Sequence, residues 1–140
     1  MIKSLGPALR AFLLDDAQIS AMVGGVRIYP SVLEQGVRQP SIVYRRITEV
    51  GDHHMKGPSG LTGPRMQIDC WAPDPDQAEQ LANLVKARLD GYRGPMAAPG
   101  SPPDVIAVQG IFFDSSRDDY DGTAELYRVS RDYFVMYEER

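Results

Sequence analysis

The 140-residue sequence has one cysteine, two histidines and no long apolar run. A single cysteine excludes a disulfide within the chain and is typical of proteins that fold in a reducing compartment. No stretch approaches the roughly 20 consecutive apolar residues that a membrane span needs. The first 16 residues lack the apolar region and cleavage site of a secretory signal. We therefore expect a chain made in the cytoplasm, with no membrane partner.

Basic residues are also in the minority. The chain has 15 Lys and Arg against 19 Asp and Glu, which gives a net charge of −4 and a pI near 5.1. A free-standing nucleic-acid binder concentrates Lys and Arg on one surface, because neutralisation of phosphates drives its affinity. Arg45 and Arg46 form only a pair within a predicted strand. Direct recognition of DNA or RNA is therefore not expected.

The residues that could carry chemistry do not form a recognisable site. Asp52, His53 and His54 are adjacent, but a structural zinc site needs four ligands and the chain has no second Cys/His pair. Cys70 lies on the apolar side of a predicted strand, which indicates a buried thiol and not a nucleophile. A calcium loop aligned on "RDDYDG" would place Arg117 where a carboxylate is required. We expect no metal, no cofactor and no catalytic residue. A ligand-binding or enzymatic domain that uses Asp52, His53 and His54 stays open as an alternative.

Helices and strands follow one another without a repeat. A helix that begins after Ser4 carries an apolar stripe, and Asp16 can cap a short second helix that ends at Gly24 and Gly25. Strands are predicted over residues 26–30, 40–50, 65–71, 105–114 and 125–139. The stripe of the first helix consists of Leu5, Leu9, Phe12 and Leu13.

The segment "RMQIDCWAPDPDQAEQLANLVKARLDGY", residues 65–92, predicts a strand followed directly by a helix. In the strand, Met66, Ile68 and Cys70 alternate with Arg65, Gln67 and Asp69, so the two sets face opposite ways. Asp74 is the expected N-cap, Pro75 the first helical residue and Gln77 the partner of a capping box. The apolar stripe of this helix consists of Ala78, Leu81, Ala82, Val85 and Leu89, and Gly91 ends it.

This order of elements predicts the α+β class. We expect one domain over residues 1–140, because its length is that of a single core. Strands joined by loops favour a mainly antiparallel sheet of about five strands, with the N-terminal helices and one long helix packed on one face.

The surface offers candidate contact residues. Two predicted loops, 50–64 and 114–124, are long for a domain of this size, and such loops are often functional. The last predicted strand places Tyr127, Arg131 and Tyr133 on one face, and tyrosine and arginine are enriched in subunit interfaces. The candidate partner or subunit contacts are Asp52, His53, His54, Met55, Lys56, Trp71, Arg117, Asp118, Asp119, Tyr120, Tyr127, Arg131 and Tyr133.

Taken in order, these segments resemble a known family. A short helical pair, "RIYP", "QPSIVYRRI", the segment of residues 65–92, an acidic loop with a tyrosine and "YRVSRDYFVMYEE" span nearly the whole chain. Their order and spacing are similar to those of the tail completion proteins, or tail terminators, of long-tailed bacteriophages and gene transfer agents.

The resemblance implies a structural, non-enzymatic virion protein. It implies a small α+β subunit that forms a hexameric ring, caps the tail tube and meets the head-completion (stopper) protein at the neck, after assembly in the host cytoplasm. DNA would be a partner only in passage through the channel. The family offers no catalytic residues to transfer, and only the two long loops correspond to its partner contacts. A stopper or a minor tail subunit is the alternative within virion biology.

Overall fold

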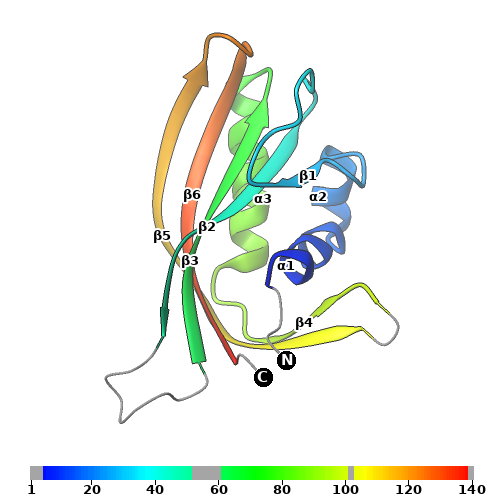
Figure 1. Ribbon diagram of the computed structural model, residues 1–140. Helices are drawn as coiled ribbons and strands as arrows, with labels where there is room; N and C mark the ends of the chain where they lie inside the picture. The colour runs from blue at the N-terminus through cyan, green and yellow to red at the C-terminus, as the bar shows by residue number, and fades with distance from the viewer. Residues whose placement is uncertain (1–4, 52–60, 101–102, 139–140) are drawn as a thin grey trace.

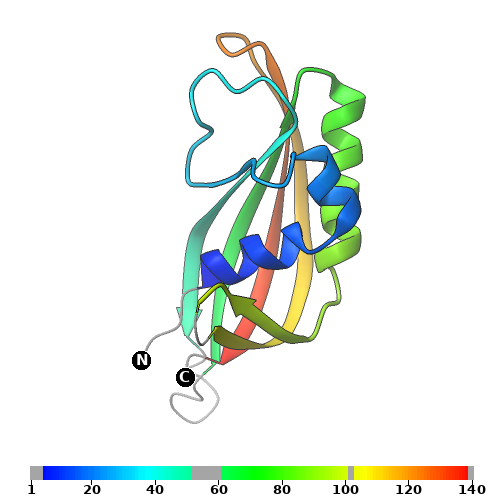
Figure 2. The same cartoon turned by 90° about the vertical axis from the view of Figure 1, so that its right-hand side faces the viewer.

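The computed structural model describes residues 5–51, 61–100 and 103–138. It is built from one curved sheet with three helices on one side of it (Figures 1 and 2). The elements are α1 (Leu5–Leu14), α2 (Ala17–Met22), β1 (Ile28–Pro30), β2 (Ser41–Gly51), β3 (Leu61–Ala72), α3 (Pro75–Leu89), β4 (Gly94–Ala98), β5 (Asp104–Asp121) and β6 (Leu126–Glu138). No helix in these described ranges is long and apolar enough to cross a membrane.

The sheet has six strands in the order β1-β2-β3-β6-β5-β4. The short strand β1 runs parallel to β2, and every other neighbouring pair is antiparallel. The α+β class is confirmed. The expected, mainly antiparallel sheet of about five strands is corrected to a mixed sheet of six. The sixth strand is β4, in a Pro/Gly-rich segment where no strand was predicted, and the parallel pair of β1 and β2 makes the sheet mixed.

The predicted loop 114–124 is also corrected. β5 continues to Asp121, and its residues from Ser115 onward pair with β6 as far as Leu126. Pairing with a neighbouring strand satisfies the backbone, so it overrides a local composition that favours a turn. The other predicted loop is shorter than expected, since β2 ends at Gly51 and β3 begins at Leu61. Asp52, His53, His54, Met55 and Lys56 lie outside the described residues.

The core lies between the helices and one face of the sheet. α3 packs against β3 and β6. The sheet curls so that its edge strand β4 lies beneath α1, and α1 packs against β4 (Figure 1). The predicted stripes of α1 and α3 supply fully buried side chains, among them Leu9, Leu13 and Leu81. Ile68 meets them from the sheet. Burial of such apolar surface is the main term that holds these layers together.

The helix caps are confirmed in one case and corrected in the other. The carboxylate of Asp16 accepts hydrogen bonds from the backbone N–H groups of Gln18 at 2.9 Å and Ile19 at 3.1 Å. Asp74 occupies the N-cap position of α3, but its side chain makes no capping hydrogen bond. The start of α3 therefore depends on Pro75 at its first positions, where the missing N–H costs nothing. Ser4, the predicted cap of α1, lies outside the described residues.

Candidate functional site

The sheet face away from the helices, called the open face below, carries paired charges. In β3 the residues alternate, so Met66, Ile68 and Cys70 enter the core while their neighbours point the other way. The strand register aligns these neighbours with the even-numbered residues of β6 and, beyond the bulge after Phe113, with the odd-numbered residues of β5. The charged residues that form ion pairs on this face are Arg45, Arg65, Asp69, Asp114, Arg117, Asp119, Arg128 and Asp132.

Asp132 is the centre of the first group of ion pairs. Its side chain is 7% exposed, and its Oδ2 accepts a hydrogen bond from Nε of Arg65 at 3.1 Å. A guanidinium nitrogen of Arg117 lies 3.5 Å from Oδ1. Arg65 also pairs with Asp114. The hydrogen bond to Asp132 is the main reason that the pKa of Arg65 is raised, so this arginine holds three strands together as a fixed cation.

Asp69 is the centre of a second group. It is 3% exposed, and its Oδ1 accepts a hydrogen bond of 2.9 Å from the amide of Gln67. Arg45 lies 3.9 Å from Oδ2. A buried carboxylate is costly unless it is paired and hydrogen-bonded, and these contacts meet that requirement.

Arg128 forms the third group, near the turn between β5 and β6. It pairs with Asp119, and its guanidinium lies 5.1 Å from the centre of the Trp71 ring. The hydrogen bond from Arg128 is the main cause that lowers the pKa of the Asp119 carboxyl. Across the three groups, four arginines face four aspartates, so the charges of the open face are locally balanced.

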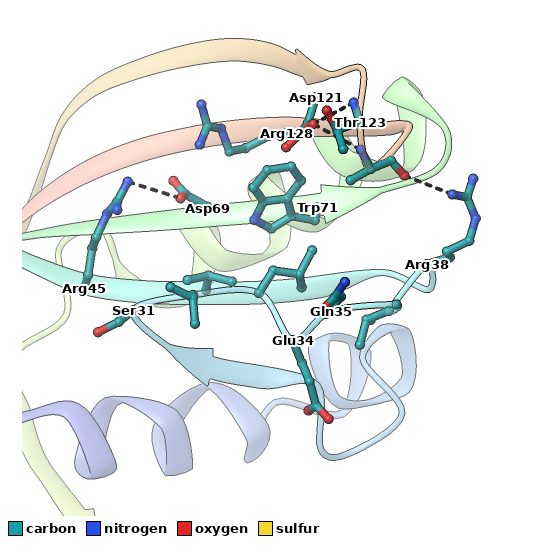
Figure 3. Close-up of a pocket in the computed structure, with 16 residues that line it drawn as sticks. Ser31, Glu34, Gln35, Arg38, Arg45, Asp69, Trp71, Asp121, Thr123 and Arg128 are labelled. Atoms are coloured by element: carbon teal, nitrogen blue, oxygen red, sulfur yellow. Dashed lines mark hydrogen bonds and ion pairs between the residues drawn. The ribbon is translucent and has the colours of Figure 1, made fainter.

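A groove lies at the end of the open face beside β1. Residues 31–38 cross over β2 there and leave a cavity of about 680 Å³ against the sheet (Figure 3). Val43, Trp71 and Leu126 form a small apolar cluster at this end. Arg38 closes the rim by donating a hydrogen bond of 2.9 Å to the carbonyl of Ala124. Nε1 of Trp71 and Nε of Arg128 are buried here without an acceptor among the described residues.

Trp71 was predicted as a candidate contact residue that points outward from the strand. It does lie on the side away from the helices, but it is only 9% exposed. Residues 31–38 of the same chain line the cavity beside it. Its part in a contact with another chain stays a prediction.

The candidate contact residues on β5 are exposed. Arg117, Asp118, Asp119 and Tyr120 are exposed along the outer half of β5. Their role in an interface stays a prediction.

The candidates on β6 lie on the side of the helices. Arg131 donates a hydrogen bond of 2.9 Å to the side chain of Asn83 on α3, and Tyr127 packs against the core. Tyr133 is fully buried within the chain, and its part in a contact with another chain stays a prediction. The odd-numbered residues of β6 form the face that meets the helices, and the sequence left the choice of face open because both faces mix apolar and charged residues.

The ion-pair network and the groove could not be predicted from the sequence. The predicted alternation of Arg65, Gln67 and Asp69 is confirmed, but the register that brings Asp132 and Asp114 to Arg65 joins strands far apart in the chain. The groove depends on the path of residues 31–38, which no periodicity marks.

The chemistry available here is recognition. Burial raises the pKa of the Cys70 thiol far above its usual range, so the thiol stays protonated and cannot act as a nucleophile at neutral pH. In the part of the chain that the structure describes, no three His, Cys, Asp or Glu side chains come together as metal ligands would. What the open face and its edges present is paired charge, backbone hydrogen-bonding groups and a half-apolar groove.

Two comparisons with known proteins found a match, one in sequence and one in fold. The sequence model of the family "Tail completion protein gp17" matches residues 7–138. The fold is similar to that of a chain from a solved structure entitled "Virion of native gene transfer agent (GTA) particle", with a TM-score of 0.71 and 15% sequence identity. The similarity covers 93% of this chain and 91% of that chain. Among curated proteins, none has a significantly matching sequence.

Proposed function

The chain belongs to the tail completion protein gp17 family of structural virion proteins, and from that premise we propose that it closes the head-proximal end of a long phage-type tail. In this role it forms a ring, with six copies as the expected number, on the last layer of the tail tube. The ring then joins the tail to the head-completion protein, the stopper. The protein is thus a component of the neck of the virion or gene transfer particle, assembled in the cytoplasm of the host.

The match of the family over residues 7–138 is the observation that carries this proposal. It includes every strand of the fold and all of the helices except the first two residues of α1, and not only one segment. The likeness in fold to a chain of a gene transfer agent virion supports the same role.

The open face supports passage of DNA through such a ring. A surface that binds nucleic acid leaves arginine or lysine free to neutralise phosphates, and each contact of that kind strengthens the binding. On the open face, Arg45, Arg65, Arg117 and Arg128 each have an aspartate partner within 4 Å. A channel wall of this kind gives passing DNA little to adhere to.

The two ends of the sheet are the proposed contacts with the two partners. The strand register places Gly51 and Leu61 at one end and the turn between β5 and β6 at the other. In a ring whose subunits stand side by side, one end meets the tail tube and the other meets the stopper. The predicted contact residues Asp52 to Lys56 follow directly after Gly51 in the chain.

Deletion of the gene from the parent particle tests the proposal. We expect tails of uncontrolled length that are not joined to filled heads, because nothing caps the growing tube. Negative-stain electron microscopy would measure the tail lengths and the fraction of joined particles. Normal-length tails on filled heads in the deletion strain would rule the proposal out.

Complementation separates loss of the fold from loss of the role. A plasmid copy of the wild-type gene should restore joined particles, and so should the Glu79→Ala variant, because Glu79 is exposed. The Leu81→Asp variant should fail, since Leu81 is fully buried in the core.

A further inference from the structure

The sheet has two long edges that no described strand covers. β1 flanks β2 only from Ile42 to Tyr44, so the edge of β2 that faces away from β3 has no described strand beside it over residues 45–51. β4 flanks β5 only from Asp104 to Val108. Asp90 and Gly91 cover the next part of β5, which leaves residues 114–121 open in the described structure. The two edges lie on opposite sides of the sheet, with β2 at the left and β5 at the right in Figure 2.

Uncovered edges of this length are unusual in a protein that acts alone. An edge strand presents backbone N–H and C=O groups that pair readily with another chain, so stable monomers keep their edges short or covered. Here the open stretches span seven residues of β2, 45–51, and eight residues of β5, 114–121. They are also similar in length, as a pair of matching surfaces would be.

The two edges carry opposite net charge. Residues 45–51 hold two arginines and one glutamate, and residues 114–121 hold four aspartates and one arginine. Arg45 and Arg46 are exposed on the edge of β2, and Asp118 and Asp119 are exposed on the edge of β5. Within the chain, Arg45 also pairs with Asp69, and Asp119 also pairs with Arg128. Opposite charges across an interface favour the correct partner, and like charges placed against one another disfavour a wrong one. The edge of β2 therefore fits the edge of β5 of another copy and repels a second edge of its own kind.

Strand direction and side-chain alternation agree with that pairing. Each step from β2 through β3 and β6 to β5 is antiparallel, so β2 and β5 of copies in the same orientation meet antiparallel. Arg45 and Asp119 both point to the open face, while Arg46 and Asp118 both point to the side of the helices. A register that pairs Arg45 with Asp119 thus also pairs Arg46 with Asp118.

We propose that neighbouring subunits join by this edge-to-edge pairing, β5 residues 114–119 of one copy with β2 residues 45–50 of the next, into one continuous closed sheet. The ring itself rests on the proposed function; the pairing of the edges names the surface that forms it. The helix layer lies on the outside, as helices do around other closed sheets, and the open face lines the channel.

The offset between the edges matches that of a closed barrel. Within one subunit, Arg45 lies level with Ser115, through Gln67 and Asp132. Asp119 lies 119 − 115 = 4 residues further along β5, or about 13 Å at ~3.3 Å per residue. The four strands from β2 to β5 are about 19 Å wide at ~4.8 Å per strand. If all copies lie at the same height along the ring axis, an offset of about 13 Å over a width of about 19 Å requires strands tilted by about 35° from that axis. This tilt lies within the range typical of closed sheets.

Charge reversal at the two edges tests the pairing. One variant carries Arg45→Glu and Arg46→Glu, and a second carries Asp118→Arg and Asp119→Arg. Each alone places like charges at every interface, so we expect at least about a tenfold loss of ring, measured by light scattering on purified protein. The same loss is expected in the joined particles of a complemented deletion strain.

Mixing the two variants should restore assembly. Each interface of an alternating ring then joins an acidic edge to a basic one, and a ring with an even number of copies closes. A chain that carries all four substitutions should also assemble, because both of its edges are exchanged. Reversal of Asp76 and Glu79, exposed on α3, is the matched control and should leave the ring unchanged.

Thermal melts first confirm that each variant is folded. If the change at Arg45 or Asp119 unfolds the chain, because it removes the partner of Asp69 or of Arg128, Arg46→Glu and Asp118→Arg form the pair of variants instead. Folded variants that assemble alone like the wild type, or that fail to assemble when mixed, would overturn the pairing. So would a wild-type chain that stays monomeric both in solution and in particles. A deletion strain with normal tails would refute the proposed function, while the mixing experiment would still decide the pairing.

Discussion

The two faces of the sheet are made by the same strands, but their buried side chains are stabilised in different ways. On the side of the helices, Ile68 and its neighbours disappear into an apolar core. On the open face, Asp69 and Asp132 are buried almost as completely, but by arginine partners. Apolar burial needs no exact partner, whereas a buried carboxylate needs one at a defined distance. The side of the helices therefore stabilises the fold, and the open face holds its charges in a fixed pattern.

The largest loss of stability should follow from a charge placed in the apolar core. Leu81→Asp buries an unpaired carboxylate among side chains that cannot pair with it, which costs several kcal/mol, so the variant should not fold. Glu79→Ala, two residues away and exposed, should change stability by less than about 0.5 kcal/mol. Circular dichroism and solubility measure both. A folded, equally stable Leu81→Asp variant would mean that α3 presents another face to the sheet.

Substitutions at two adjacent residues of β3, one on each face, compare directly how much the two faces contribute to stability. Ile68→Ala removes a fully packed side chain and should lower the free energy of unfolding by about 2–4 kcal/mol. Gln67→Ala removes one hydrogen bond to Asp69 on the other face and should cost about 1 kcal/mol. Urea denaturation of the two variants measures the difference, and equal losses would contradict the contrast between the faces.

The centre of the ion-pair network should contribute less than the core. Asp132→Ala leaves Arg65 and Arg117 without their shared partner. A fully buried pair would cost more, but these arginine side chains are 28% and 53% exposed, so water replaces part of the interaction. We expect a loss of about 2 kcal/mol in urea denaturation. A variant as stable as the wild type would show that the network has no structural role.

The smallest effect should be the pH dependence of the pair between Asp119 and Arg128. The pKa of Asp119 is lowered in the folded chain, so its contribution is present above the ordinary carboxyl pKa of 3.8 and is lost as the pH falls through the lowered value. Asp119→Asn should therefore melt slightly below the wild type at neutral pH, and the two should converge in strong acid. Glu79→Gln, exposed on α3 with no described ion pair, should melt like the wild type throughout.

Much of the core between the helices and the sheet could be predicted from the sequence. The stripe of α3, its start at Pro75 and the alternation of β3 follow from local periodicity, which the packing then obeys. The outer half of β5 could not be predicted, because "SSRDDYDG" is turn-like by composition and becomes a strand only by pairing with β6. The burial of Tyr133 also depended on a choice of face that only the position of the helices decides.

Electron cryo-microscopy of the head-proximal end of the tail in the parent particle tests the central claim most directly. The account predicts a ring of this chain between the tail tube and the head, with helices outside and the edge of β5 of each copy paired with the edge of β2 of the next. Arg45 and Asp119 of neighbouring copies would then face each other on the channel wall. A ring whose sheets are separated at their edges, or this chain at another place in the particle, would contradict it.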